Sequence, residues 1–127
     1  MKNAVNWFEI YVSDFNRATK FYTEVFKYKL TELPMGNDNH PEMKYAIFNG
    51  HANGEGADGA LVKINQVQPG GGGTLVYFNT EEINDELSRV EAAGGKIIRS
   101  KQNIGDYGFI ALVEDSEGNL IGMHSQK

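Results

Sequence analysis

The fold of this chain is decided by residues 5–26, which read VNWFEIYVSDFNRATKFYTEVF. Side chains alternate along residues 5–12, which is the two-residue period of a β-strand, and Trp7 and Glu9 share one face of it. Asp14 is placed to cap a helix in which apolar residues then recur at spacings of three and four. A helix with one apolar stripe must bury it, so we expect this helix to pack on a sheet.

Three further strands and a linker are expected in the first half of the chain. The strands cover residues 29–33, 43–48 and 59–64, and the turn-forming residues 34–41 separate the first two. Residues 67–73 contain four consecutive glycines, which make regular structure entropically expensive. We therefore expect a linker there.

The same order of elements is expected again after the linker. A strand over residues 74–78 precedes a helix that begins at Glu81 or Glu82 and ends at Gly94-Gly95, since glycine accepts the left-handed conformation of a helix end. Three more strands follow, over residues 96–100, 108–113 and 119–124.

This repetition predicts two βαβββ modules in one α+β domain that spans residues 1–127. The first module covers residues 1–66 and the second residues 74–127. Paired half-buried sheets of this kind can curve around a shared cleft. The alternative is a single ferredoxin-like α+β sandwich in which the second unit is a coincidence.

The composition limits the classes of function. The chain has no cysteine, which excludes thiol catalysis and thiolate metal sites. Its net charge of −5, with lysine and arginine scattered among acidic residues, argues against nucleic acid as a partner. The amino terminus lacks a secretion signal and no window approaches the ~20 apolar residues of a membrane span, so we expect a cytoplasmic protein without a membrane partner.

The glycines at residues 70–73 do not form a phosphate-binding loop. No helix with a Lys-Ser or Lys-Thr start follows them, and the chain has no dinucleotide fingerprint. We expect no cofactor.

Short motifs in both halves carry a family resemblance. In the first half they are residues 8–14, Arg17-Ala18, Phe21-Tyr22 and Phe26; in the second they are residues 74–78, Ala92-Ala93-Gly94-Gly95 and Asp115-Ser116-Glu117-Gly118-Asn119. In combination they resemble the vicinal-oxygen-chelate superfamily of glyoxalases, bleomycin-resistance proteins and dioxygenases. The resemblance implies paired βαβββ modules in a curved mixed sheet, a U-shaped cavity for a small molecule, and a homodimer.

The resemblance also implies four metal-ligand positions, and the residues found there are not ligands. Trp7 stands where metal-using relatives carry His or Gln, and Thr74 where they carry His; Ala60 and Gly122 stand where they carry carboxylates. A divalent ion needs several nitrogen or anionic oxygen donors. We therefore expect no metal at this place, which argues against metal-dependent isomerase and dioxygenase chemistry.

Glu9 and His124 are the candidate catalytic residues. Glu9 shares the cavity face with Trp7, where it could bind a cation, act as a general base, or be satisfied by a hydroxyl, an arginine or water. His124 lies on the face of Gly122 and could exchange protons near neutral pH or be a rim residue. A sharper hypothesis pairs the two across the cleft.

The remaining candidates are aromatic residues and loop histidines. The ligand pocket is expected to include Trp7, Glu9, Ala60, Thr74, Phe78, Tyr107, Gly122 and His124. Core packing alone is expected for Phe8, Ile10, Phe21, Tyr22, Leu75, Tyr77, Leu87, Val90, Ile121 and Met123. An irregular metal site from His40 and His51 with Glu42, Glu55 and Asp58 is conceivable, but a solvated role is favoured.

Two functions follow from these residues. One is a glyoxalase-like protein that binds a small molecule without the usual metal and acts as a divergent lyase or isomerase through Glu9. The alternative is a non-catalytic protein that sequesters a drug or metabolite, as bleomycin-resistance proteins do. A regulatory scaffold is a third possibility.

Overall fold

The computed structural model describes residues 7–34, 36, 41–49, 56–65, 67–71 and 75–127, except the side chain of Tyr107. The first module contains β1 (Trp7–Tyr11), α1 (Phe15–Phe26), β2 (Leu30–Leu33), β3 (Lys44–Phe48) and β4 (Asp58–Lys63). The second contains β5 (Tyr77–Asn79), α2 (Ile83–Val90), β6 (Lys96–Asn103), the 3₁₀ turn η1 (Gly105–Tyr107), β7 (Phe109–Glu114) and β8 (Leu120–Ser125). No helix in these ranges has the length and apolar character needed to cross a membrane.

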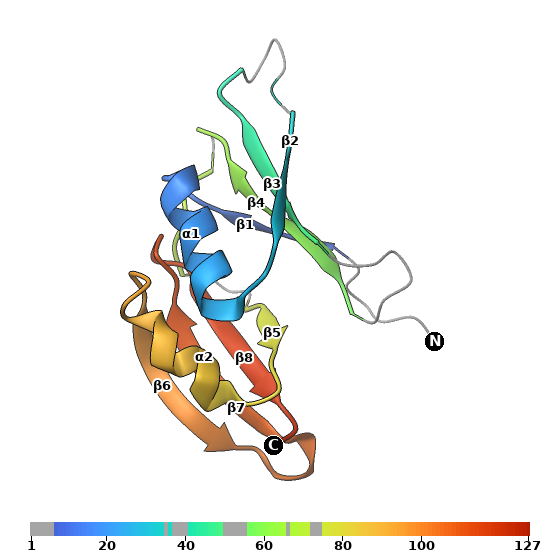
Figure 1. Ribbon diagram of the computed structural model, residues 1–127, viewed down its shortest axis with the longest axis vertical. Coiled ribbons are helices and arrows are strands. Elements are labelled where there is room, and N and C mark those ends of the chain that lie inside the picture. Colours follow the sequence, from blue (N-terminus) through green and yellow to red (C-terminus); the bar gives the residue numbers. More distant parts are fainter. Residues whose placement is uncertain (1–6, 35, 37–40, 50–55, 66, 72–74) are drawn as a thin grey trace.

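The two modules have the same topology. One four-stranded sheet has the order β1-β4-β3-β2 and the other the order β5-β8-β7-β6. In each sheet the first strand pairs in parallel with the last, and the other pairs are antiparallel. Figure 1 shows the first sheet above the second, with each helix beside its own sheet. The predicted α+β fold of paired βαβββ modules is confirmed, and the single ferredoxin-like sheet is not what the chain forms.

The helix α1 begins directly after its predicted cap Asp14, whereas α2 begins at Ile83, just after the predicted start at Glu81 or Glu82. Asp14 accepts a hydrogen bond from the Arg17 amide at 3.0 Å, and Glu82 accepts one from the Asn84 amide at 3.2 Å. These side chains satisfy amides that have no partner inside the helix. The predicted apolar stripe of α1 is buried as expected; it consists of Phe15, Ala18, Phe21, Tyr22, Val25 and Phe26.

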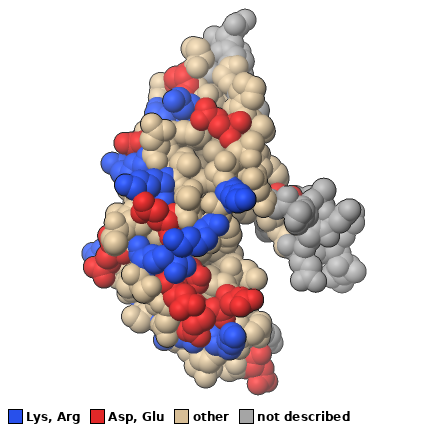
Figure 2. Space-filling model, in the orientation of Figure 1, with Lys and Arg blue, Asp and Glu red and all other residues tan. Residues whose placement is uncertain are grey.

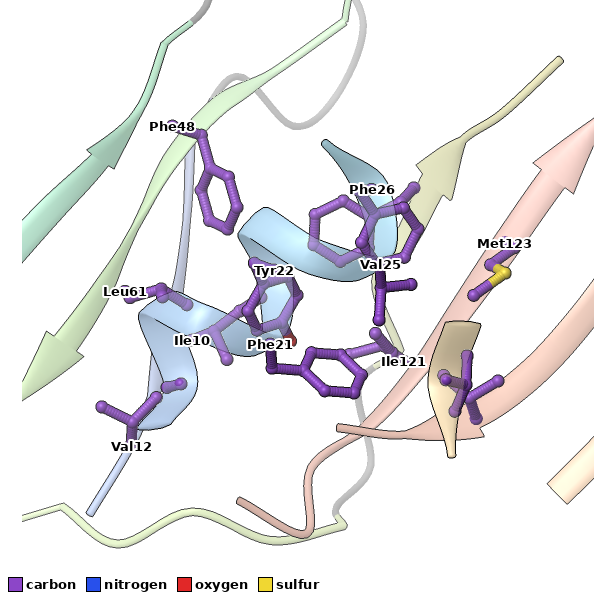
Figure 3. Close-up of a cluster of buried hydrophobic side chains, with 14 of the residues drawn as sticks. Ile10, Val12, Phe21, Tyr22, Val25, Phe26, Phe48, Leu61, Ile121 and Met123 are labelled. Atoms are coloured by element: carbon purple, nitrogen blue, oxygen red, sulfur yellow. The ribbon is translucent and has the colours of Figure 1, made fainter. Parts of the chain in front are cut away.

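One hydrophobic core joins the modules. Side chains of α1 point into it between the sheets, as Figure 3 shows for Phe21 and Tyr22. Phe78 of the second module lies with its ring centroid 5.8 Å from that of Phe8 and 5.8 Å from that of Phe48, both of the first module. Aromatic pairs at such distances stabilise a core beyond their buried area. The shared core holds β1 and β5 in fixed relative positions.

A polar cluster at the turn between β7 and β8 ties the modules together a second time. The Glu117 carboxylate accepts hydrogen bonds from the amides of Ser13 and Asp14 and from the Arg17 guanidinium. The Asn119 side chain donates to the Tyr11 carbonyl at 2.8 Å and accepts from the Gly70 amide at 2.7 Å. The second module therefore binds β1, the start of α1 and the linker.

Candidate functional site: a groove between β1 and β5

A groove of about 790 Å³ opens where β1 of the first module approaches β5 of the second. Pockets that bind small molecules have volumes of this order. Its described lining residues are Trp7, Phe8, Glu9, Tyr28, Phe48, Asn49, Gly56, Ala57, Asp58, Leu75, Val76, Tyr77, Phe78 and Asn79. Trp7, Tyr77 and Asp58 come from three different strands that only the fold brings together.

Glu9 lies in this groove with both carboxylate oxygens engaged. The Tyr11 hydroxyl donates to Oε1 at 2.8 Å, and the Tyr45 hydroxyl donates to Oε2 at 2.6 Å. Tyr11 shares the strand face of Glu9, whereas Tyr45 comes from β3, across the β4 strand. Of the roles open to Glu9, the structure shows a carboxylate held by hydroxyls of its own sheet.

The two phenols are held in the protonated, donating form. Burial, followed by the hydrogen bond and charge of Glu9, raises the pKa of Tyr45 to about 12, against a hydrogen bond from Trp7 that lowers it. For Tyr11 the order is reversed: the hydrogen bond to Glu9 is the main cause of its raised pKa, and burial is the second. Both hydroxyls therefore orient the carboxylate at neutral pH, and its negative charge is presented to the groove.

The groove is acidic and aromatic. Glu9 and Asp58 contribute carboxylates, and its described lining residues include neither lysine nor arginine. Trp7 is 43% exposed and Tyr77 is 45% exposed, although large aromatic side chains are usually much more buried. On the molecular face drawn in Figure 2, basic and acidic side chains are intermixed. The groove thus combines acidic groups with exposed aromatic rings.

The structure corrects residue assignments on β5 and just before it, where Leu75, expected to pack only in the core, is partly buried and lines the groove. Tyr77, which we expected in the core, is half exposed and lines the groove, whereas Phe78 is 6% exposed and belongs mainly to the core. The predicted register was one residue off. In the first module Trp7 lies seven residues before the helix cap Asp14. In the second module the residue seven positions before the cap Glu82 is Leu75, so Leu75 and not Thr74 is the counterpart of Trp7.

Tyr77 lies directly over Gly122. The two are partners in the parallel β5–β8 ladder. A methyl group at position 122 would lie 2.4 Å from Cδ1 and 2.5 Å from Cε1 of the Tyr77 ring. The ring therefore fills the space that a side chain at position 122 would need.

The positions at which the resemblance implies metal ligands can now be read with the corrected register. They hold Trp7, Ala60, Leu75 and Gly122, which are an indole, two aliphatic side chains and a glycine covered by a ring. In the part of the chain that the structure describes, three or more His, Asp or Glu residues do not come together at any point as metal ligands would.

The remaining predicted site residues are Ala60, His124, Tyr107 and several residues outside the described ranges. Ala60 is fully buried opposite Glu9 in the β1–β4 ladder, and His124 is partly exposed opposite Asn79 in the β5–β8 ladder. Neither is a lining residue, so pairing of His124 with Glu9 stays a prediction. Tyr107 lies in η1, and nothing is described of its side chain. Thr74, His40, His51 and Glu55 lie outside the described residues.

Sequence reasoning missed Asp58 as a groove residue. It was considered only as part of a loop metal site, yet it is the first residue of β4 and the ladder partner of Trp7. Alternation back from Ala60 along the same strand would have placed it on the groove face.

Comparison with known proteins agrees with this architecture. The chain is 24% identical over 124 residues to CFP32 of Mycobacterium tuberculosis, whose name describes it as a candidate glyoxylase. That match covers 93% of this chain and spans only 44% of the length of the relative.

Solved structures share the fold. A glyoxalase-related enzyme from Fulvimarina pelagi superposes with a TM-score of 0.68 at 17% identity, covering 98% of this chain and 88% of its own. TnmS3, an antibiotic binding protein from Streptomyces sp. CB03234, has a TM-score of 0.66 at 24% identity and covers 99% of this chain and 98% of its own. A family model matches residues 4–123, and the chain belongs to the Glyoxalase/Bleomycin resistance protein/Dioxygenase superfamily.

Proposed function

We propose that this protein binds a planar cationic small molecule in the groove between β1 and β5 and holds it without converting it. The observation that carries the proposal is the lining of the groove, where the exposed rings of Trp7 and Tyr77 accompany the carboxylates of Glu9 and Asp58. Aromatic faces attract cations and stack on flat molecules, and the carboxylates add charge complementarity.

Binding is a better account of Glu9 than proton transfer. A general base needs a lone pair directed at the proton that it removes, within hydrogen-bond reach. Here each Glu9 oxygen accepts a phenol hydroxyl, from Tyr11 and from Tyr45. Such a carboxylate is oriented and stabilised as a fixed negative charge, which suits attraction of a cation.

The same proposal includes independence from a metal ion. Two arguments support it. Trp7, Ala60, Leu75 and Gly122 offer no side-chain ligand for a divalent ion, and binding through rings and carboxylates requires no metal. An antibiotic-binding protein among the structural neighbours supports a sequestering role on the same scaffold. A homodimer also stays a proposal, and sedimentation at several protein concentrations tests it.

Calorimetric titration with three probes tests the proposed function. Proflavine is a planar cation, anthracene-9-carboxylate a planar anion and tetrapropylammonium a non-planar cation. We expect proflavine to bind with one-to-one stoichiometry and more tightly than the other two. Binding of the anion as tightly as proflavine, or no binding of proflavine, would overturn the proposal.

A matched pair of variants locates the bound cation. Glu9→Gln keeps the shape of the side chain and removes its charge, and we expect it to weaken proflavine binding about tenfold, or ~1.4 kcal/mol. Glu91→Gln removes one charge at the end of α2, outside the groove lining, and is expected to leave affinity unchanged. Equal effects of the two changes would contradict binding at Glu9. Turnover of a hemithioacetal substrate that is lost in Glu9→Gln would favour the enzyme hypothesis instead.

A further inference from the structure

We propose that Gly122 is a specificity-determining residue, because its lack of a side chain lets the Tyr77 ring lie against β8 as a stacking wall for flat ligands. The inference rests on the proposed function and adds to it the structural element that selects planar cations over other cations.

The first observation is the fit between the ring and the glycine. Tyr77 and Gly122 are ladder partners on adjacent strands, and three ring atoms would lie 2.4, 2.5 and 3.0 Å from a methyl group at position 122. Real Cβ atoms essentially never come within 3.0 Å of another heavy atom. Any residue other than glycine at position 122 must therefore move the ring.

The second observation is that the ring has both a support and a free side. Tyr77 is 45% exposed and lines the groove, so the part of it that does not contact Gly122 is accessible to a ligand. The groove also contains Trp7, which is 43% exposed. A planar ligand can stack on aromatic surface in this space, while a compact non-planar cation gains only charge attraction.

A glycine and ring in the first module show why the exposure of Tyr77 matters. Phe8 and Gly59 are also ladder partners, and a methyl group at position 59 would lie 2.6 Å from three Phe8 ring atoms. Phe8 also lines the groove, but it is partly buried and its ring packs against Phe48 and Phe78 of the core, which leaves it less room to move than the Tyr77 ring. Tyr77 is 45% exposed, so we expect its ring to turn toward the groove when position 122 carries a side chain. A side chain at position 122 is thus expected to reshape the binding space and leave the core intact.

A double-mutant cycle with Gly122→Ala and Tyr77→Ala tests the inference. We expect Gly122→Ala to weaken proflavine binding about tenfold and to change tetrapropylammonium binding less than twofold. In the Tyr77→Ala protein, which has no ring to displace, adding Gly122→Ala is expected to change proflavine affinity less than twofold. If Gly122→Ala acts by displacing the ring, its effect is absent from the Tyr77→Ala protein; if it disturbs β8 generally, the effect remains.

Gly71→Ala is the matched control, since nothing lies within 4 Å of a methyl group at position 71. It is expected to leave both affinities unchanged. The ring position can also be measured without a ligand, because an aromatic ring over Gly122 shifts the NMR signal of an α-proton of this glycine upfield. Tyr77→Ala adds no atoms that could crowd the fold and should abolish that shift.

The outcomes distinguish this inference from the proposed function. Failure of the wild-type protein to bind proflavine would overturn both. Proflavine binding by the wild type that Gly122→Ala leaves unchanged, or weakens equally with and without the Tyr77 ring, would overturn only the role of Gly122. Absence of the upfield shift in the wild type would overturn it as well.

Discussion

Arg17 of α1 and Glu117 of the β7–β8 turn form a bidentate ion pair between the modules. Nε of Arg17 lies 2.6 Å from Oε2 of Glu117, and Nη2 lies 3.0 Å from Oε1. The Glu117 side chain is fully buried, while that of Arg17 is 53% exposed. The carboxylate also accepts from the amides of Ser13 and Asp14. Glu117 is therefore the acceptor on which the joint between the modules depends.

Glu117→Gln is expected to lower the free energy of unfolding by about 3 kcal/mol. The Arg17 guanidinium and the amides of Ser13 and Asp14 donate to this carboxylate, and the NH2 group of Gln cannot accept their hydrogen bonds. Breaking a buried ion pair also leaves the charge of its partner uncompensated. Urea denaturation measures the change. Glu24→Gln, in the exposed pair with Lys20 at 3.8 Å, is the control and should change stability by less than ~0.5 kcal/mol. Comparable losses in the two variants would show that Glu117 does not carry the joint.

The stabilisation by Glu117 is expected to disappear in acid. Burial alone would raise the pKa of Glu117, but the hydrogen bonds from Arg17 and Asp14, with those of two serines, lower it from 4.5 to about 2. A carboxyl group with a lowered folded-state pKa contributes its full stabilisation above its unfolded pKa and loses it as the pH falls through the folded pKa. The stability difference between wild type and Glu117→Gln should therefore narrow as the pH falls from 4.5 towards 2.

The neighbouring Asp115 is present in both proteins of that comparison. Burial raises its pKa, against hydrogen bonds from Tyr22 and Asn119, so its own contribution has the opposite dependence on pH. Subtracting the free energies of unfolding of the two proteins at each pH removes this common contribution of Asp115. A difference that stays constant or widens down to pH 2 would contradict the assigned role of Glu117.

Gly59→Ala is expected to destabilise the protein by about 2 kcal/mol, and more than Gly122→Ala does. The new methyl group would collide with Phe8, whose ring packs at 5.6 Å from that of Phe48 in the core. Overpacking of a core of this kind costs about 1–3 kcal/mol. At position 122 the collision is with a half-exposed Tyr77. Thermal and urea unfolding of both variants check the order, and an equal loss would show that Tyr77 is held as firmly as Phe8.

Glu9→Gln is expected to lower the pKa of the Tyr45 and Tyr11 phenols. The charge and hydrogen bonds of Glu9 raise both pKa values, and the amide keeps the shape of the side chain while removing the charge. The pKa of Tyr45 should nevertheless remain above 10, because burial is the largest cause of its rise to about 12. Absorbance titration of tyrosine ionisation measures this, with Glu91→Gln as a control expected to follow the wild-type curve. Coinciding curves for Glu9→Gln and wild type would mean that the phenols do not bind Glu9 in solution.

Metal analysis of purified, tag-free protein is expected to find no stoichiometric divalent ion, and a chelator should leave proflavine affinity unchanged. The reason is the donor set at the superfamily's ligand positions, where Leu75 and Gly122 provide no donor side chain. A tightly held ion that is lost together with ligand binding would contradict metal independence.

Much of the fold could be predicted because its signals are local. Apolar spacing along α1, the capping residue Asp14 and alternation along β1 each involve neighbours in sequence. The error on β5 has a physical cause. Residues 74–78 read TLVYF, and four of the five residues are apolar or aromatic, so alternation does not show which face is buried. Packing of Phe78 against Phe8 and Phe48 decides the register.

The candidate site was predicted only in part. Trp7 and Glu9 were assigned to the cavity face because their strand alternates clearly, and both line the groove. The Glu9–Tyr45 hydrogen bond joins residues 36 positions apart, and β4 lies between their strands, so no spacing rule could indicate it.

The sequence by itself determined the two βαβββ modules and which residues stand on β1, β4 and β8 where the resemblance implies ligands, because periodicity and residue type are properties of the chain. Only the tertiary structure decided that Tyr77 covers Gly122, that Asp58 joins Glu9 in the groove, and that Glu117 holds the modules together. These arrangements depend on which strands become neighbours, and packing of the shared core determines that.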